Sequence, residues 1–168
     1  MHKANQIILE KELGENLIRE IATLESEVFH KSLAWEESEL RHILSMSGTI
    51  SVIAYDENAR IAGYLLAVNL SDEIEELKEA DPEIAEIPNA LYLNNIVVRP
   101  DMRGKGIFSQ MVQKFLNAVP DKTITLHAST ANSSSAGMQK NGARFVRRIE
   151  NWYGSGEPFD YLIFEPKK

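Results

Sequence analysis

Hydrophobic positions recur along the chain with two different periods, and each period indicates a type of element. Apolar residues three and four positions apart predict helices over residues 15–29, 36–45, 106–119 and 133–141. Apolar runs rich in β-branched and aromatic residues predict strands over 6–9, 50–55, 61–68, 91–98, 123–128, 143–148 and 159–164. A weaker helix is expected over 72–79. This order favours an α/β fold with a mixed sheet and helices on both faces.

Length and composition narrow the class of protein. The 168 residues contain no linker, repeat or low-complexity tract, so we expect a single domain over residues 1–168. No apolar run reaches the roughly 18 residues of a membrane span, and the first residues lack the apolar core of a signal peptide. We therefore expect a cytoplasmic protein with no membrane partner. The absence of cysteine excludes disulfides, a thiol nucleophile and cysteine-ligated metal sites.

Charge is concentrated in one segment. The net charge is −7, and residues 71–89 hold eight acidic side chains and one lysine, so this segment carries the whole excess. An acidic chain is a poor candidate for nucleic-acid binding, which depends on neutralising phosphates. The segment is either a rim that attracts cationic ligands or a solvated loop.

A basic, glycine-rich turn follows the strand predicted over residues 91–98. It reads Arg103-Gly104-Lys105-Gly106 and leads directly into an amphipathic helix. Backbone amides at a helix N-terminus, together with two cations, suit a phosphate or pyrophosphate. The turn matches neither the Walker A motif nor the dinucleotide fingerprint. The alternative is a basic turn that merely caps the helix.

The run from Arg103 to Phe108 resembles the acyl-CoA pyrophosphate motif of the GCN5-related N-acetyltransferases (GNAT), Arg/Gln-x-x-Gly-x-Gly/Ala. Here the motif reads Arg103-x-x-Gly106-x-Phe108, so its last position departs from the family pattern. The resemblance implies acetyl-CoA as co-substrate, no metal, and a central strand 91–98 that diverges from the next strand to admit the pantetheine arm. The cofactor-binding residues it implies are Ile96, Val97, Val98, Arg103, Gly104, Lys105, Gly106, Ile107, Phe108 and Asn132.

Further segments continue the resemblance in the family's order. Residues 126–132 resemble the fifth strand running into an asparagine, and residues 138–145 resemble the Tyr-Glu-Lys-Leu-Gly-Phe segment. Residues 151–153, followed by Asp160, resemble segments of the ribosomal-protein N-alpha-acetyltransferase branch. The similarity covers about residues 91–164, with a weaker topological match over 6–68. It implies a mixed, largely antiparallel central sheet flanked by helices on both faces.

Two departures from the family bear on catalysis. The position of the usual tyrosine acid holds Met138, and the position of a glutamate base found in relatives holds His127. A histidine can accept a proton at neutral pH, so His127 is our candidate base, or else a residue beside the sheet core with no catalytic role. Tyr153 is the candidate acid, or an aromatic covering the sheet edge. Tyr92 and Asn94 lie on one face of the strand predicted over residues 91–98 and Asn95 lies on the other, and either face could hold a water that relays the amine proton.

The predicted function is acetyl transfer to a primary amine of a small molecule or peptide by direct attack on the thioester. The alternative is a non-catalytic acyl-CoA-binding sensor or regulatory module. An acidic segment beside the acceptor site would suit a cationic amine, and Trp35 either lines that site or packs. The oligomeric state is open, a homodimer included.

Overall fold

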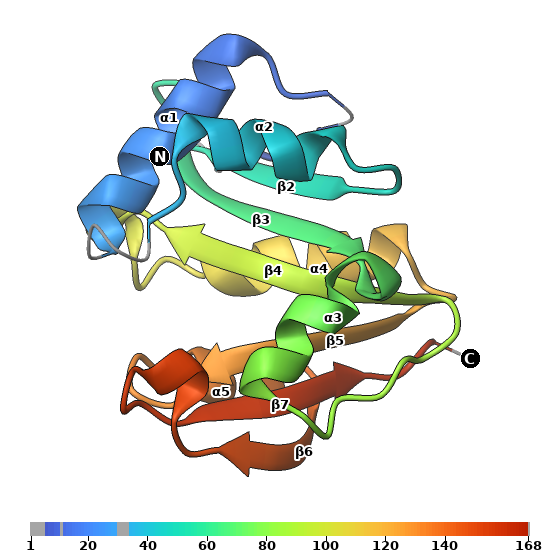
Figure 1. Ribbon diagram of the computed structural model, residues 1–168. Coiled ribbons are helices and arrows are strands. Elements are labelled where there is room, and N and C mark those ends of the chain that lie inside the picture. The colour runs from blue at the N-terminus through green and yellow to red at the C-terminus, as the bar shows by residue number, and fades with distance from the viewer. Residues whose placement is uncertain (1–5, 11, 30–33, 168) are drawn as a thin grey trace. The chain divides into compact units, whose positions relative to one another are not determined.

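The computed structural model describes residues 6–10, 12–29 and 34–167 (Figure 1). Its strands are β1 (Gln6–Glu10), β2 (Ile50–Tyr55), β3 (Ile61–Asn69), β4 (Ala90–Val98), β5 (Thr123–Ser129), β6 (Arg144–Ile149) and β7 (Phe159–Phe164). Its α-helices are α1 (Glu15–Val28), α2 (Glu37–Ser45), α3 (Leu70–Ala80), α4 (Ile107–Ala118) and α5 (Ser134–Lys140). All the predicted strands and helices are therefore confirmed, including the weak helix in the acidic segment.

Two short 3₁₀ helices were not predicted, η1 (Pro100–Met102) and η2 (Trp152–Gly154). The helix predicted from residue 106 instead begins at Ile107, because Gly106 has a φ of +79° and so cannot continue a right-handed helix. Gly106 still accepts the first hydrogen bond of that helix, from the Gln110 amide at 3.0 Å. The sequence thus located the element but not its first residue.

The chain divides into two compact units, each built from two separate stretches of sequence. Unit 1 comprises residues 1–67 and 95–118, and unit 2 comprises residues 68–94 and 119–168. Strand β4 contributes its first half to unit 2 and its second half to unit 1. Hydrogen-bonded neighbours follow the order β1-β2-β3-β4-β5-β7-β6, a mixed, mostly antiparallel sheet that confirms the expected fold class. The single domain expected over residues 1–168 stays a prediction.

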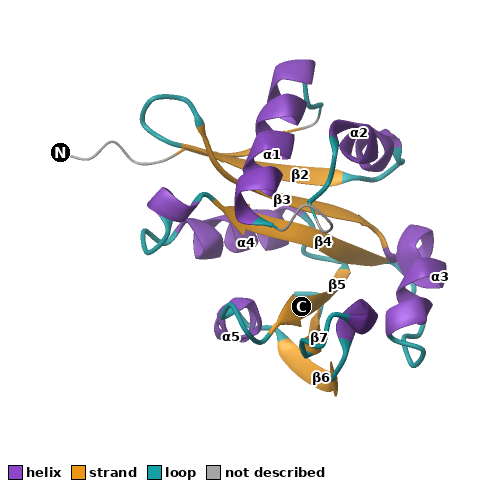
Figure 2. Ribbon diagram, turned by 60° about the vertical axis from the view of Figure 1, so that its left-hand side comes forward, coloured by secondary structure: helices purple, strands orange, loops and turns teal. Residues whose placement is uncertain are grey.

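Unit 1 places helices on both faces of its strands. β1 pairs with β2 and β2 with β3, all antiparallel. Figure 2 shows α1 and α2 on one side of β2 and β3, and α4, which contacts β1 and β2, on the other. The apolar side chains of α1 and α2 form one buried cluster with Ile53, Tyr64 and Val97. A Cβ on Gly63 would lie 2.6 Å from the Val97 carbonyl oxygen, so only glycine permits this close strand contact.

Unit 2 contains the point at which the sheet loses its regular pairing. β4 and β5 run parallel, but only Ala90–Tyr92 pair with Thr123–Thr125, although both strands continue. Beyond that point β5 keeps its antiparallel pairing with β7, which in turn pairs with β6. Helix α5 packs against β5 and β7, and α3 lies against η2. The β4–β5 ladder therefore ends at Tyr92, and the strand divergence that the GNAT resemblance implies stays a prediction.

No helix in the described part of the chain has both the length and the apolar character needed to cross a bilayer.

Candidate active site

The glycine-rich turn between β4 and α4 has an open, exposed shape. Gly104 has a φ of +76°, and a Cβ there would meet nothing within 4 Å. Arg103 and Lys105 are exposed, and the Arg103 Nε donates to the Val98 carbonyl at 3.3 Å. The first amides of α4, at Ile107 and Phe108, have no acceptor within the helix because of their position in its first turn. Uncommitted amides and two exposed cations suit an anionic group.

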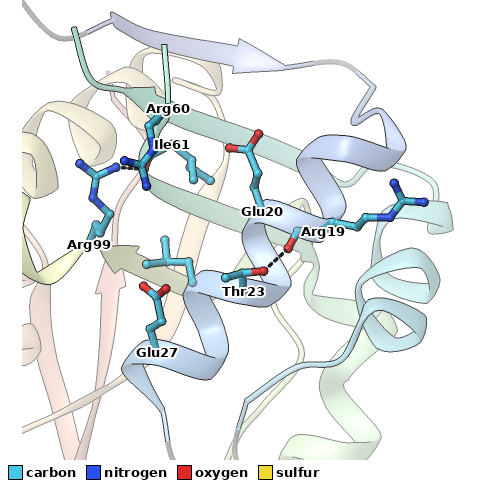
Figure 3. A pocket seen from close by; sticks show the side chains of 8 residues that line it. Arg19, Glu20, Thr23, Glu27, Arg60, Ile61 and Arg99 are labelled. Atoms are coloured by element: carbon cyan, nitrogen blue, oxygen red, sulfur yellow. Dashed lines mark hydrogen bonds between the residues drawn. The ribbon is translucent and has the colours of Figure 1, made fainter. Parts of the chain in front are cut away.

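Arg99 fixes the start of this turn. Its guanidinium donates to Asp56 at 2.9 Å, to Asp101 at 2.6 Å and to the Ile61 carbonyl at 2.6 Å. Arg99 also lies at one end of a groove of about 290 Å³ between α1 and the start of β3, together with Arg60 (Figure 3). Because the Arg99 guanidinium is already bonded to three protein groups, its role is to tie the turn to the β2–β3 hairpin.

A buried polar network in unit 1 escaped the sequence analysis. Glu25 of α1 is 1% exposed and accepts a hydrogen bond from the Asn95 amide at 2.6 Å and another from the Trp35 N–H at 3.3 Å. The same Asn95 amide donates to the Tyr64 hydroxyl at 3.0 Å. Burial raises the pKa of Glu25 to about 7, against the opposing effect of these donors. Trp35 is partly buried and packs against the cluster of unit 1.

The same asparagine affects one of the expected cofactor contacts. The Asn95 Oδ1 accepts a hydrogen bond from the Ile96 N–H at 3.0 Å. That donor is therefore already engaged within the protein, although the resemblance assigned the Ile96 backbone to the pantetheine arm.

The imidazole of His127, on β5 in unit 2, has partners at both nitrogens. Nδ1 lies 2.8 Å from the Tyr92 hydroxyl, and Nε2 lies 2.9 Å from the Asp81 Oδ2. The side chain is 0% exposed, so His127 contacts solvent through neither nitrogen. Burial lowers the pKa of His127 more than the Asp81 carboxylate raises it, so the imidazole is neutral at pH 7. His127, the candidate base, is therefore buried, and its Nδ1 is hydrogen-bonded to the Tyr92 hydroxyl.

Aromatic rings hold this imidazole in place. The Trp152 ring lies 4.3 Å from it and the Tyr161 ring 4.8 Å, both at tilts near 30°. The guanidinium of Arg147 lies 4.6 Å over the Tyr161 ring and also donates to Asp81. These contacts restrict rotation of His127, so its two hydrogen bonds keep their directions.

The other candidates in unit 2 have structural partners. The Tyr153 hydroxyl donates to the Glu76 carbonyl of α3 at 3.1 Å, and burial followed by three nearby carboxylates raises the pKa of Tyr153 to about 12. The Asn132 Oδ1 accepts from the Ser134 N–H at 3.1 Å and so shapes the start of α5. Met138 is fully buried in α5.

Asn94 carries the one buried side-chain acceptor without a hydrogen-bond partner among the described residues. Its Oδ1 is buried yet has no hydrogen-bond partner. Burying an acceptor without a hydrogen bond costs free energy, and a donor on a bound ligand would offset that cost. It lies two positions beyond Tyr92, on the same face of β4 by strand alternation.

Unit 2 contains the hydrogen-bonded pair of Tyr92 and His127, and unit 1 contains the exposed basic turn. No three His, Asp or Glu side chains within residues 6–10, 12–29 and 34–167 are grouped so as to hold a metal ion. Proton transfer and acyl chemistry are the reactions these groups can support.

Comparison with known proteins gives a family match. The family model described as the acetyltransferase (GNAT) family matches residues 15–142. No curated protein matches the sequence significantly.

Solved structures resemble the chain in fold at low sequence identity. The ribosomal-protein-S18-alanine N-acetyltransferase from Escherichia coli is 12% identical, with a TM-score of 0.72 over 98% of this chain and 96% of that one. NAA60 from Arabidopsis thaliana, in complex with acetyl-CoA, is 15% identical, with a TM-score of 0.68 over 96% and 98%. Mutant forms of the spermidine/spermine N-acetyltransferase SpeG from Vibrio cholerae are 14% identical, with a TM-score of 0.65 over 96% and 94%.

Proposed function

The chain belongs to the acetyltransferase (GNAT) family, and we propose that it transfers the acetyl group of acetyl-CoA to a primary amine. The observation that carries this proposal is the hydrogen bond between the Tyr92 hydroxyl and the His127 imidazole, beside the end of the β4–β5 ladder. It supplies a proton acceptor, which amine acetylation needs and mere acyl-CoA binding does not.

The β4–α4 turn is our proposed binding site for the pyrophosphate of acetyl-CoA. Its residues fit that group, because the Gly104 backbone is open and the Arg103 and Lys105 side chains are exposed. We assign the pantetheine contacts to the backbone of Val97 and Val98. The Ile96 N–H is left out because Asn95 already accepts it.

The proposed reaction begins with loss of a proton from the acceptor ammonium group. The Tyr92 oxygen takes this proton while its own proton passes to the His127 Nδ1, so that one proton moves from amine to imidazole. The neutral amine then attacks the thioester carbonyl, which forms the carbon–nitrogen bond and leaves a positive charge on the nitrogen. The carbon–sulfur bond breaks to release the CoA thiolate, and the nitrogen gives its second proton to solvent to leave the neutral amide. The resulting imidazolium is stabilised by the Asp81 carboxylate at 2.9 Å.

The thiolate must finally take up a proton. Tyr153 is our proposed donor, since its raised pKa of about 12 keeps it protonated at neutral pH. Its hydroxyl would first have to leave the Glu76 carbonyl. Solvent is the alternative proton source, because a thiolate is a stable enough leaving group to be protonated after departure.

We propose that the acceptor is a cationic amine. The pKa of Tyr153 is raised by burial and in part by three carboxylates of α3, those of Glu76, Glu79 and Glu73. Tyr153 itself is 48% exposed. An acidic helix beside an exposed aromatic ring raises the local concentration of cations.

The test is thiol release from acetyl-CoA, followed with a disulfide dye, across polyamines, basic amino acids, aminoglycosides and short peptides. The chain has no cysteine, so the protein adds no thiol signal. Amine-dependent release would support the proposal. Acetyl-CoA binding without release for any amine would support the alternative of a regulatory acyl-CoA-binding module.

A further inference from the structure

Asp81 differs from the other acids of its segment. It follows the last residue of α3 and is 1% exposed, whereas its neighbours Glu79 and Glu83 are exposed. Its Oδ2 accepts from the His127 Nε2 at 2.9 Å, and Arg147 donates from Nε to its Oδ1 at 3.0 Å and from a terminal nitrogen to its Oδ2. Asp81 is therefore a buried, fully bonded carboxylate and not part of a solvated acidic rim.

The chemistry of these partners determines which imidazole nitrogen carries the proton. An ionised carboxylate can only accept hydrogen bonds, so Nε2 must be the protonated nitrogen of a neutral His127. Nδ1 is then the acceptor, and the Tyr92 hydroxyl must donate to it. In the other tautomer, Nε2 and the carboxylate would present lone pairs to each other across 2.9 Å.

We propose that Asp81 is a positioning residue that holds His127 in the Nε2–H tautomer and leaves Nδ1 ready to receive the proton of Tyr92. Arg147 assists by fixing both oxygens of Asp81. The inference deepens the acetyl-transfer function proposed above and rests on it for its catalytic meaning. The tautomer itself is a property of the free protein and is measurable without any substrate.

Four titratable groups face His127 from four different elements: Asp81 at the end of α3, Tyr92 on β4, Arg147 on β6 and Tyr161 on β7. Trp152 of η2 covers the ring as well. Burial lowers the pKa of His127 most strongly; Asp81 raises this pKa against that effect, and Arg147 lowers it further. Removing Asp81 or Arg147 must therefore move the titration of His127 in opposite directions.

The decisive experiment is ¹⁵N NMR of the imidazole nitrogens in full-length wild-type protein, Asp81→Asn and Asp160→Asn between pH 5 and 8. Asp160 is the matched control, because it is 2% exposed in the same unit and paired with Arg148 but does not contact the imidazole. We expect a protonated Nε2 and an unprotonated Nδ1 in wild-type protein and in Asp160→Asn. In Asp81→Asn, Arg147 should keep the amide oxygen, so that the amide nitrogen faces Nε2 and the tautomer is reversed.

One further variant, Arg147→Met, covers the case in which Asp81→Asn fails to fold. Arg147→Met keeps the carboxylate, so it should preserve the tautomer and shift the imidazole titration to higher pH, whereas Asp81→Asn should shift it to lower pH. In acetyl transfer we expect kcat of Asp81→Asn to fall by about 10²–10⁴-fold, with a KM for acetyl-CoA within threefold of wild type. An Nδ1–H or mixed tautomer in wild-type protein would overturn the inference, as would an unchanged tautomer in Asp81→Asn. Absence of acetyl transfer by wild-type protein with the expected tautomer intact would instead count against the proposed function alone.

Discussion

The hydroxyl of Tyr92 lies 2.8 Å from the Nδ1 of His127, although the two residues are 35 positions apart in the sequence. The parallel pairing of Tyr92 with Thr125 brings them together, because His127 follows Thr125 by two positions and so lies on the same face of β5. The ladder ends at this pair. The hydrogen-bonded pair of Tyr92 and His127 therefore lies at the end of the β4–β5 ladder.

The first prediction concerns the Tyr92 hydroxyl. Tyr92→Phe keeps the ring but removes the group that hands a proton to His127, so kcat should fall by about 10²–10⁴-fold while the KM for acetyl-CoA stays within threefold. Loss of a partner for the buried Nδ1 should also lower the free energy of unfolding by about 1–3 kcal/mol. Steady-state kinetics and urea denaturation measure the two effects.

Tyr161→Phe is the matched control, since the Tyr161 ring lies 4.8 Å from the same imidazole, whereas its hydroxyl is hydrogen-bonded to Thr125. Its kcat should exceed that of Tyr92→Phe by at least about tenfold. Equal losses in the two variants would show that ring packing, and not the hydroxyl, supports turnover.

The second prediction concerns the β4–α4 turn. Arg103→Ala and Lys105→Ala remove exposed cations from the proposed pyrophosphate site and should each raise the Kd for CoA by about tenfold, or about 1.4 kcal/mol. Because both side chains are exposed, the melting temperature should stay unchanged. Isothermal titration with CoA and with pantetheine, which has no phosphate, separates the contribution of the pyrophosphate from that of the pantetheine arm. The affinity for pantetheine should be the same in both variants as in the wild-type protein. An unaltered Kd for CoA in both would remove the turn from the donor site.

The third prediction concerns pH-dependent stability through Glu25. Its pKa in the folded protein is about 7, above the ordinary 4.5, because burial disfavours the carboxylate. Between these values the folded state binds more protons than the unfolded state, so this contribution to stability is present at low pH and is lost as the pH rises through 7. The loss amounts to at most ~3 kcal/mol.

Glu25→Gln should therefore gain stability relative to wild-type protein as the pH is raised from 5 to 8, as measured by urea denaturation at each pH. Glu27→Gln on the same helix is the control for the substitution itself, because Glu27 is exposed. A Glu25→Gln difference that is constant between pH 5 and 8 would mean that the Glu25 carboxyl does not titrate in this range.

The fourth prediction separates two neighbouring asparagines. The Asn94 Oδ1 has no partner in the described residues, so Asn94→Ala should change the free energy of unfolding by less than about 1 kcal/mol. Asn95→Ala should cost about 1–3 kcal/mol, since it removes the donor to the Oε1 of the buried Glu25 and the acceptor of the Ile96 N–H. If the Asn94 carbonyl binds the acceptor amine, Asn94→Ala should raise the KM for the amine about tenfold. A stability loss equal to that of Asn95→Ala would make Asn94 a structural residue.

The sequence predicted the elements well because their apolar periods are clear and are bounded by proline and glycine. It also singled out His127 and the turn from Arg103 to Phe108, through residue spacing shared with the GNAT family. Asp81 could not be found this way, since a 46-residue separation gives no sign of the pairing with His127. The burial of Glu25, in contrast, could have been predicted from the sequence. Glu25 lies seven positions after Ile18 and four after Ile21, so it is an acid within the buried stripe of an amphipathic helix.

We propose that this chain acetylates an amine and uses His127 as the base. The most direct measurement compares wild-type protein with His127→Ala in two assays, acetylated amine formed from acetyl-CoA, detected by product mass, and calorimetric titration with acetyl-CoA. We predict acetylated product with the wild-type protein, and at least a 100-fold slower rate with His127→Ala at an acetyl-CoA affinity within threefold. The account would be contradicted by equal rates in the two proteins, or by a wild-type protein that binds acetyl-CoA and acetylates no amine.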